Sequence, residues 1–212
     1  MSDIRIGRIV IGRNQTNCYF LYREGSPEAI VIDPADQGDK IADKLAGNGF
    51  KVCAIYLTHG HFDHIWGVDG LKQSLDTPVK VYACESEREL LQDPYQNISG
   101  QMHRPCTVEA DVYVRDGEEI TTADISCKVI ATPGHTIGGC CYYFAEAGIL
   151  VCGDTLFQES VGRTDFPTGD MSALVRSVRE KLFVLPEETK CFPGHGDSTT
   201  IGHEKKYNPF CV

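Results

Sequence analysis

Short apolar runs bounded by glycine, proline and aspartate predict β-strands along most of the chain. Ile4–Ile11 alternates apolar and polar residues, as expected for a strand with one buried face. Val52–Leu57 is apolar throughout, which is typical of a strand covered on both faces. The other predicted strands are Asn17–Tyr22, Ala29–Ile32, Val79–Ala83, Val112–Val114, Cys127–Ala131, Cys140–Phe144, Ile149–Val151 and Lys190–Phe192.

Helical spacing of apolar residues interrupts these strands at several places. Met171–Leu182 is the clearest case, because Leu174, Val178 and Leu182 recur on one face. Shorter helices are predicted at Asp39–Leu45, Ile65–Ser74, Glu85–Leu91 and Thr200–Tyr207. Residues 93–109 show no periodicity, so we expect a long loop there, of the kind that is often functional.

Two strand-rich halves, each with its own helices, predict an α+β fold in which two mixed sheets pack face to face with helices outside. The absence of a glycine- and serine-rich linker favours a single domain over residues 1–212. The first residues lack the profile of a secretory signal, and no apolar run approaches the roughly 20 residues of a membrane span. We therefore expect a cytoplasmic protein, a monomer or small homo-oligomer, whose ten cysteines are reduced thiols.

A formal net charge of −10 argues against nucleic acid or an anionic membrane as the main partner. It does not exclude an anionic small substrate, because the charge of a metal site can dominate locally.

Five of the seven histidines occur in patterns typical of metal ligands. The densest pattern is H-x-H-x-D-H, which contributes His59, His61, Asp63 and His64 directly after a predicted strand. Three further candidates follow glycines at predicted strand ends, namely His135, Asp154 and His195. Seven candidates exceed the needs of one tetrahedral ion, so two adjacent metals are predicted.

We assign His59, His61 and His135 to a first metal, and Asp63, His64 and His195 to a second. Asp154 would bridge the two ions. Asp33 and Thr58 are expected to support the ligands through hydrogen bonds. The two remaining histidines, His103 in the predicted loop and His203 beside charged residues, are interpreted as surface groups.

Two divalent ions with two carboxylates and one hydroxide keep a positive net charge, which would attract an anion. Such a pair can activate water and polarise a carbonyl oxygen, so we expect a hydrolase in which a metal-bridging hydroxide attacks and Asp63 orients it. Zinc is the expected metal, and iron and manganese are alternatives for this ligand set.

The motifs H-x-H-x-D-H, T-P-G-H-T, G-D-T-L-F and P-G-H-G, in this order, resemble those of the metallo-β-lactamase superfamily. Gly153–Phe157 and Gly162–Phe166 are similar to the glyoxalase II group, and the stretch from Phe192 to Phe210 is similar to its short bacterial glyoxalase II-like members, also described as hydroxyacylglutathione hydrolase-like. The resemblance implies an αββα sandwich and a thioesterase acting on S-D-lactoylglutathione or a related acyl thioester.

This chain departs from the longer glyoxalase II enzymes in two respects. We expect no C-terminal glutathione-binding helical domain, and Arg163-Thr164-Asp165 replaces a Lys-Phe-Tyr grouping. Arg163 either binds a substrate carboxylate or forms an ion pair with Asp165.

Two rivals from other classes stay open. A persulfide dioxygenase of the same fold would use one iron, held here by His59, His135 and Asp154. A non-enzymatic metal-binding or scaffold protein is the second rival, although no feature of the sequence supports it directly.

Overall fold

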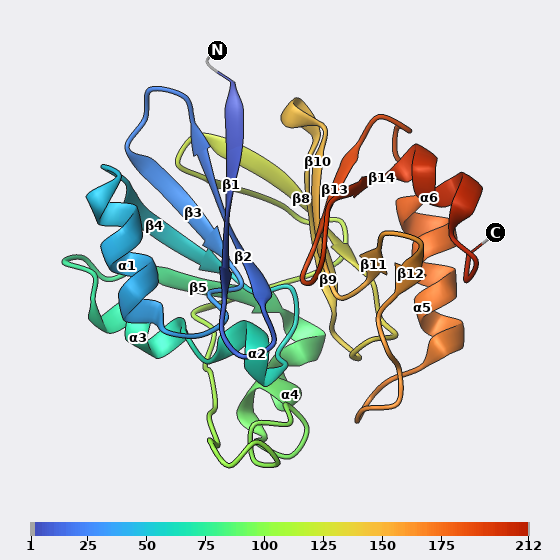
Figure 1. Ribbon diagram of the computed structural model, residues 1–212, viewed down its shortest axis with the longest axis horizontal. Coiled ribbons are helices and arrows are strands. Elements are labelled where there is room, and N and C mark those ends of the chain that lie inside the picture. Colours follow the sequence, from blue (N-terminus) through green and yellow to red (C-terminus); the bar gives the residue numbers. More distant parts are fainter. Residues whose placement is uncertain (1–2, 212) are drawn as a thin grey trace.

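Two six-stranded sheets face each other in the computed structural model, which describes residues 3–211 (Figure 1). Met1 and Ser2, which begin the segment predicted not to be a secretory signal, lie outside the described residues, as does Val212. The first sheet has the order β1-β2-β3-β4-β5-β6. Its strands are β1 (Ile4–Ile11), β2 (Thr16–Arg23), β3 (Glu28–Ile32), β4 (Lys51–Tyr56), β5 (Lys80–Cys84) and β6 (Val112–Val114).

The second sheet has the order β14-β13-β10-β9-β8-β7. Its strands are β7 (Glu119–Thr122), β8 (Ile125–Ala131), β9 (Cys140–Phe144), β10 (Ile149–Gly153), β13 (Lys190–Pro193) and β14 (Thr199–Thr200). Each sheet contains parallel and antiparallel pairs, so both are mixed, as predicted. A small hairpin, β11 (Leu156–Phe157) and β12 (Ser160–Val161), follows β10.

Helices cover the outer face of each sheet (Figure 1). On one side lie α1 (Gly38–Gly47) and α3 (Val68–Gln73), and on the other α5 (Met171–Ser177) and α6 (Ile201–Tyr207). The shorter α2 (Phe62–Ile65) and α4 (Arg88–Gln92) lie below the first sheet. The arrangement is the predicted αββα sandwich.

Side-chain alternation explains how the strands build three apolar layers. Ile30 and Ile32 of β3 point between the sheets, where they join a core with Tyr142, whereas Val31 points outward to the layer with α1. A third layer packs β10 against α5, with Leu150 among its members. Each sheet is therefore buried on both faces along its central strands.

One predicted helix differs from the structure in a way that matters for the site. Ile65–Ser74 was expected to be continuous, but α2 begins earlier, at Phe62, and α3 starts only at Val68. Gly67 packs so closely that a Cβ there would lie 2.3 Å from the Pro34 carbonyl oxygen. His64 consequently lies inside α2, as its third residue, and not directly before the longer predicted helix.

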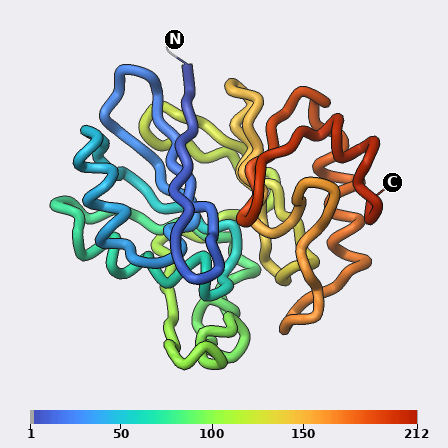
Figure 2. The backbone as a smooth tube through the Cα atoms, viewed as in Figure 1, coloured from blue at the N-terminus to red at the C-terminus, as the bar shows by residue number. Residues whose placement is uncertain are grey.

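Residues 93–109 form the predicted long loop, without a helix or strand (Figure 2, the green loop at the bottom of the view). Met171–Leu182 is helical throughout, although its second half, Val178–Leu182, is wound as a π-helix. Within residues 3–211, no helix is both long and apolar enough to cross a membrane.

Candidate metal centre

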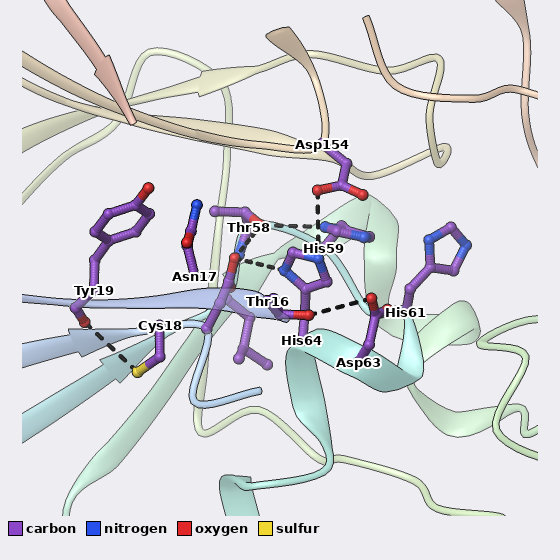
Figure 3. Close-up of polar contacts among 12 residues, drawn as sticks. Thr16, Asn17, Cys18, Tyr19, Thr58, His59, His61, Asp63, His64 and Asp154 are labelled. Carbon is purple, nitrogen blue, oxygen red and sulfur yellow. Dashed lines mark hydrogen bonds and ion pairs between the residues drawn. The ribbon is translucent and has the colours of Figure 1, made fainter. Parts of the chain in front are cut away.

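The seven candidate ligands meet because four strands, β4, β8, β10 and β13, end at the same place. His59, His61, Asp63 and His64 follow β4, and His135 follows β8. The other two ligands come from the same edge, with Asp154 after β10 and His195 after β13. Figure 3 shows Asp154 reaching from one sheet toward the histidines carried by the other.

The ligand atoms fall into three overlapping groups, each within a span of 4.8 Å. The groups are His59, His61 and His135; His59, His64 and Asp154; and Asp63, His64 and His195. The first and third reproduce the two sets assigned from the sequence. Asp154 lies between them, because its oxygens approach His64 Nε2 at 3.4 Å, His195 Nε2 at 3.5 Å and His135 Nε2 at 3.6 Å.

The buried atoms at the centre of the cluster have the character of metal ligands. Among the described residues, the Nε2 atoms of His59, His61 and His64 and Oδ1 of Asp154 have no hydrogen-bond partner. Burying several unpaired polar atoms in one place costs free energy, unless a cation binds their lone pairs. The histidine and carboxylate donors therefore fit divalent zinc, iron or manganese.

A second layer of contacts turns the imidazoles toward the centre. Asp33 accepts hydrogen bonds from the Thr58 amide at 2.8 Å, the Thr58 hydroxyl at 2.6 Å and His64 Nδ1 at 2.9 Å. Thr58 Oγ1 lies 3.2 Å from His59 Nδ1. His135 Nδ1 lies 2.7 Å from the carbonyl oxygen of Arg163. That carbonyl was not predicted, because a main-chain acceptor leaves no mark in the sequence.

Asp63 is held from the turn between β1 and β2. Its Oδ2 accepts hydrogen bonds from Asn14 Nδ2 at 2.9 Å and from Thr16 Oγ1 at 3.3 Å, and lies 3.3 Å from His195 Nε2. Asn14 and Thr16 were not predicted, because they lie 49 and 47 residues away from Asp63 and belong to no metal motif.

Charge in the cluster is unevenly distributed. Burial lowers the pKa of His61 to about 3 and, with help from His64, lowers the pKa of His59 well below its usual value. Burial also opposes charge on His64, but Asp154 and Asp33 outweigh it and raise the pKa of His64 well above its usual value. Burial disfavours ionised Asp154, yet His64 and other histidines lower its pKa to about 2. A metal ion binding at His64 must therefore displace a proton.

Two glycines of the motifs are needed for space. A Cβ at Gly194 would lie 2.2 Å from Asp154 Oδ1 and 2.6 Å from His64 Cε1. Gly153 has a φ of +46°, and a Cβ there would lie 2.3 Å from Thr58 Oγ1. The small residues before Asp154 and His195 thus allow the two sheet edges to approach each other.

The cluster opens into a cavity of about 560 Å³, a size suited to a small-molecule substrate. His61, Asp63, His135, Asp154 and His195 lie at its base, and two arginines, Arg13 and Arg163, are among its other lining residues. Its apolar wall includes Phe62, Trp66, Ile98, Met102 and Phe166. Ile98 and Met102 come from the predicted loop, which therefore contributes to the cavity.

Arg163 forms an ion pair with Asp165, one of the two alternatives left open by the sequence. Its Nε and Nη2 donate to the Asp165 carboxylate at 2.7 and 2.6 Å, and its guanidinium lies 3.8 Å from the Phe166 ring centroid. A substrate carboxylate would have to compete with Asp165 for this group. His103 is exposed, and His203 lies 3.0 Å from Glu159, so neither joins the cluster.

The chain belongs to the metallo-beta-lactamase superfamily, whose family model matches residues 11–195. It is 35% identical to the probable metallo-hydrolase YqgX of Bacillus subtilis, over 96% of this chain and 95% of that protein. It is 31% identical to the hydroxyacylglutathione hydrolase GloC of Haemophilus influenzae, over 92% of each chain.

Solved structures share the same fold. The BLEG-1 B3 metallo-beta-lactamase superposes with a TM-score of 0.92 and 36% identity, over 98% of this chain and all of that one. The protein TTHA1623, solved in a di-iron-bound form, superposes with a TM-score of 0.85 and 32% identity, over 96% of this chain and 99% of that one. ETHE1 from Myxococcus xanthus superposes with a TM-score of 0.80 and 28% identity, over 97% of this chain and 83% of that one. Family and site together define a metal-dependent hydrolase with a His/Asp metal site.

Proposed function

We propose that this protein is a binuclear thioesterase that hydrolyses S-D-lactoylglutathione or a related acyl thioester. The observation that carries the proposal is the convergence of seven ligand side chains, in two sets joined by Asp154, at the base of one cavity. Two similar proteins support the proposal: one was solved in a di-iron-bound form, and the other is named as a hydroxyacylglutathione hydrolase.

Three histidines, His59, His61 and His135, would hold one divalent ion, and Asp63, His64 and His195 the other, with Asp154 shared. Bound there, the two ions would lower the pKa of a water molecule and polarise the thioester carbonyl. Zinc is the first choice for this ligand set, and iron or manganese would also fit.

Asp63 is the residue we propose as catalytic, because it faces the cavity while its position is fixed. Asn14 and Thr16 hold its Oδ2, and interactions led by His195 lower its pKa against the effect of burial. An ionised carboxylate in this place can accept a hydrogen bond from an attacking water and orient it.

An anionic substrate is favoured by the cations of the cavity. Arg13 lines the cavity and makes no ion pair with any residue between 3 and 211. A carboxylate on the thioester could bind Arg13 without displacing another acid, while its carbon chain packs against Trp66 and Met102. We place the reaction in the cytoplasm, in keeping with ten cysteines that form no disulfide.

A mononuclear iron persulfide dioxygenase is a second candidate function, and one sample of the protein tests both candidates. His135 Nε2 lies 3.6 Å from Asp154 Oδ2, and each of these residues shares a potential metal-binding group with His59, so these three would be the iron ligands. Anaerobically purified protein is assayed for S-D-lactoylglutathione hydrolysis, for β-lactam hydrolysis and for oxygen uptake with glutathione persulfide. The proposal expects fast thioester hydrolysis and no oxygen uptake; oxygen uptake without hydrolysis would establish the dioxygenase instead.

A further inference from the structure

Glu87 is a buried carboxylate that touches both loops of the three-histidine set. It lies in the short 3₁₀ turn Glu85–Glu87 after β5, and only 1% of its surface is exposed. Its Oε1 accepts a hydrogen bond from the Gly60 amide at 2.9 Å, and its Oε2 accepts one from the Gly138 amide at 2.7 Å.

The two amides belong to the segments that carry the ligands. Gly60 stands between His59 and His61, and Gly138 follows His135 by three residues. The two segments are far apart in the sequence, and Glu87 itself comes from a third element. One carboxylate therefore connects the two loops that must meet for three imidazoles to converge.

Close packing at both contacts shows that the loops are pressed against the Glu87 segment. A Cβ at Gly138 would lie 2.2 Å from the Glu87 nitrogen, and a Cβ at Gly60 would lie 2.7 Å from Leu90 Cδ2. A main-chain hydrogen bond, from Cys140 N to the Thr58 carbonyl oxygen at 2.8 Å, joins the same loops beside the strands. The two hydrogen bonds accepted by Glu87 are a second connection between the same loops.

We propose that Glu87 is a positioning residue that fixes His59, His61 and His135 in a metal-ready arrangement. This inference rests on the proposed metal site, but it does not depend on which thioester is hydrolysed. A carboxylate suits the task because each of its oxygens accepts one N–H. Glutamine has one oxygen and one NH₂ group, so one of the two amides would face a donor and lose its partner.

The test is a Zn²⁺ titration of metal-free Glu87→Gln against a competing chelator. We expect one of the two binding steps to weaken by about 10- to 100-fold, the range seen when supporting residues of metal sites are changed. The other step should stay within about threefold of wild type. Wild-type affinity in both steps would overturn the proposal, whatever the hydrolytic activity of the protein.

Glu204→Gln is the matched control. Glu204 is also fully buried and accepts hydrogen bonds from the Thr199 hydroxyl, the Glu159 amide and Asn208 Nδ2. None of these partners lies on the loops of the three-histidine set. Both substitutions should lower the melting temperature, but Glu204→Gln should leave unchanged the affinity of the binding step that Glu87→Gln weakens.

A measurement on the wild type decides the matter if Glu87→Gln does not fold. In metal-free protein, the amides of Gly60 and Gly138 should exchange with solvent far more slowly than that of exposed Gly25. Exchange of either amide as fast as that of Gly25 would show that Glu87 does not hold the loops before the metal binds.

Discussion

Asp33 Oδ2 lies 2.9 Å from His64 Nδ1, and this contact leaves the opposite nitrogen of His64 facing Asp154 at 3.4 Å. The same carboxylate accepts two hydrogen bonds from Thr58, whose hydroxyl reaches His59. Asp33 thus orients candidate ligands of both proposed ions through their Nδ1 atoms, directly at His64 and through Thr58 at His59. This role explains why an acidic residue lies buried at this strand end.

Asp33→Asn should weaken metal binding by about 10- to 100-fold, because the amide cannot accept all three hydrogen bonds in the same geometry. Isothermal titration with Zn²⁺ measures the effect. Asp111→Asn is the control, since Asp111 accepts a hydrogen bond from the Val81 amide and pairs with Lys72, and neither partner is a candidate ligand. Equal affinity in the two variants would contradict the role given to Asp33.

Gly194→Ala should disturb the site more than its single added methyl group suggests. The new Cβ would collide with the side chains of Asp154 and His64, so one ligand must move. We expect a loss of metal content and at least about a tenfold loss of activity. Gly47→Ala, where the space is open and the helix favours alanine, should leave both unchanged.

Arg13→Gln should raise KM for a thioester that carries a carboxylate by about tenfold, equivalent to about 1.4 kcal/mol, and leave kcat nearly unchanged. A neutral thioester of similar size should show no such change. Arg115→Gln, which removes a cation paired with Glu85 outside the residues that line the cavity, serves as the control. Equal KM changes for charged and neutral substrates would argue against carboxylate binding by Arg13.

A pH-dependent contribution to stability is expected from Asp116, which accepts hydrogen bonds from Lys181 Nζ at 2.9 Å and from the Ala131 amide at 2.8 Å. Burial opposes its ionisation, but Lys181 and the Ala131 amide together outweigh burial and lower its pKa. A lowered folded-state pKa contributes stability above the unfolded value, about 3.9, which is lost as the pH falls through the folded value.

Metal-free Asp116→Asn should therefore melt about 1–4 °C below wild type at pH 7 and pH 5, a small effect because the pair is partly exposed to solvent. The difference should shrink by pH 3, where the wild-type carboxyl begins to protonate. Thermal scans at the three pH values test this, and a gap that widens toward pH 3 would reverse the predicted sign.

The sequence predicted the central strands and both sheets because their apolar runs are long and clearly bounded. It missed β7, a short edge strand in which Ile120 is the only large apolar residue, and the two-residue strands β11, β12 and β14. Such strands form because a neighbouring strand offers hydrogen bonds, which a local pattern cannot reveal.

The same limit applies to the site. The ligand candidates stood out because histidine and aspartate recur at motif spacings after strands. Asn14, Thr16 and Glu87 did not, because each supports the cluster from a distant segment through ordinary hydrogen bonds. Arg163 could not be decided from sequence either, since its pairing with Asp165 depends on how the loop folds.

The central claim, that one cluster holds two metal ions, is tested most directly by crystallography of zinc-loaded protein with anomalous scattering at the zinc edge. We predict two peaks about 3.5–4 Å apart, one beside His59, His61 and His135 and the other beside Asp63, His64 and His195. A single fully occupied peak held by His59, His135 and Asp154, at saturating zinc, would contradict the binuclear site.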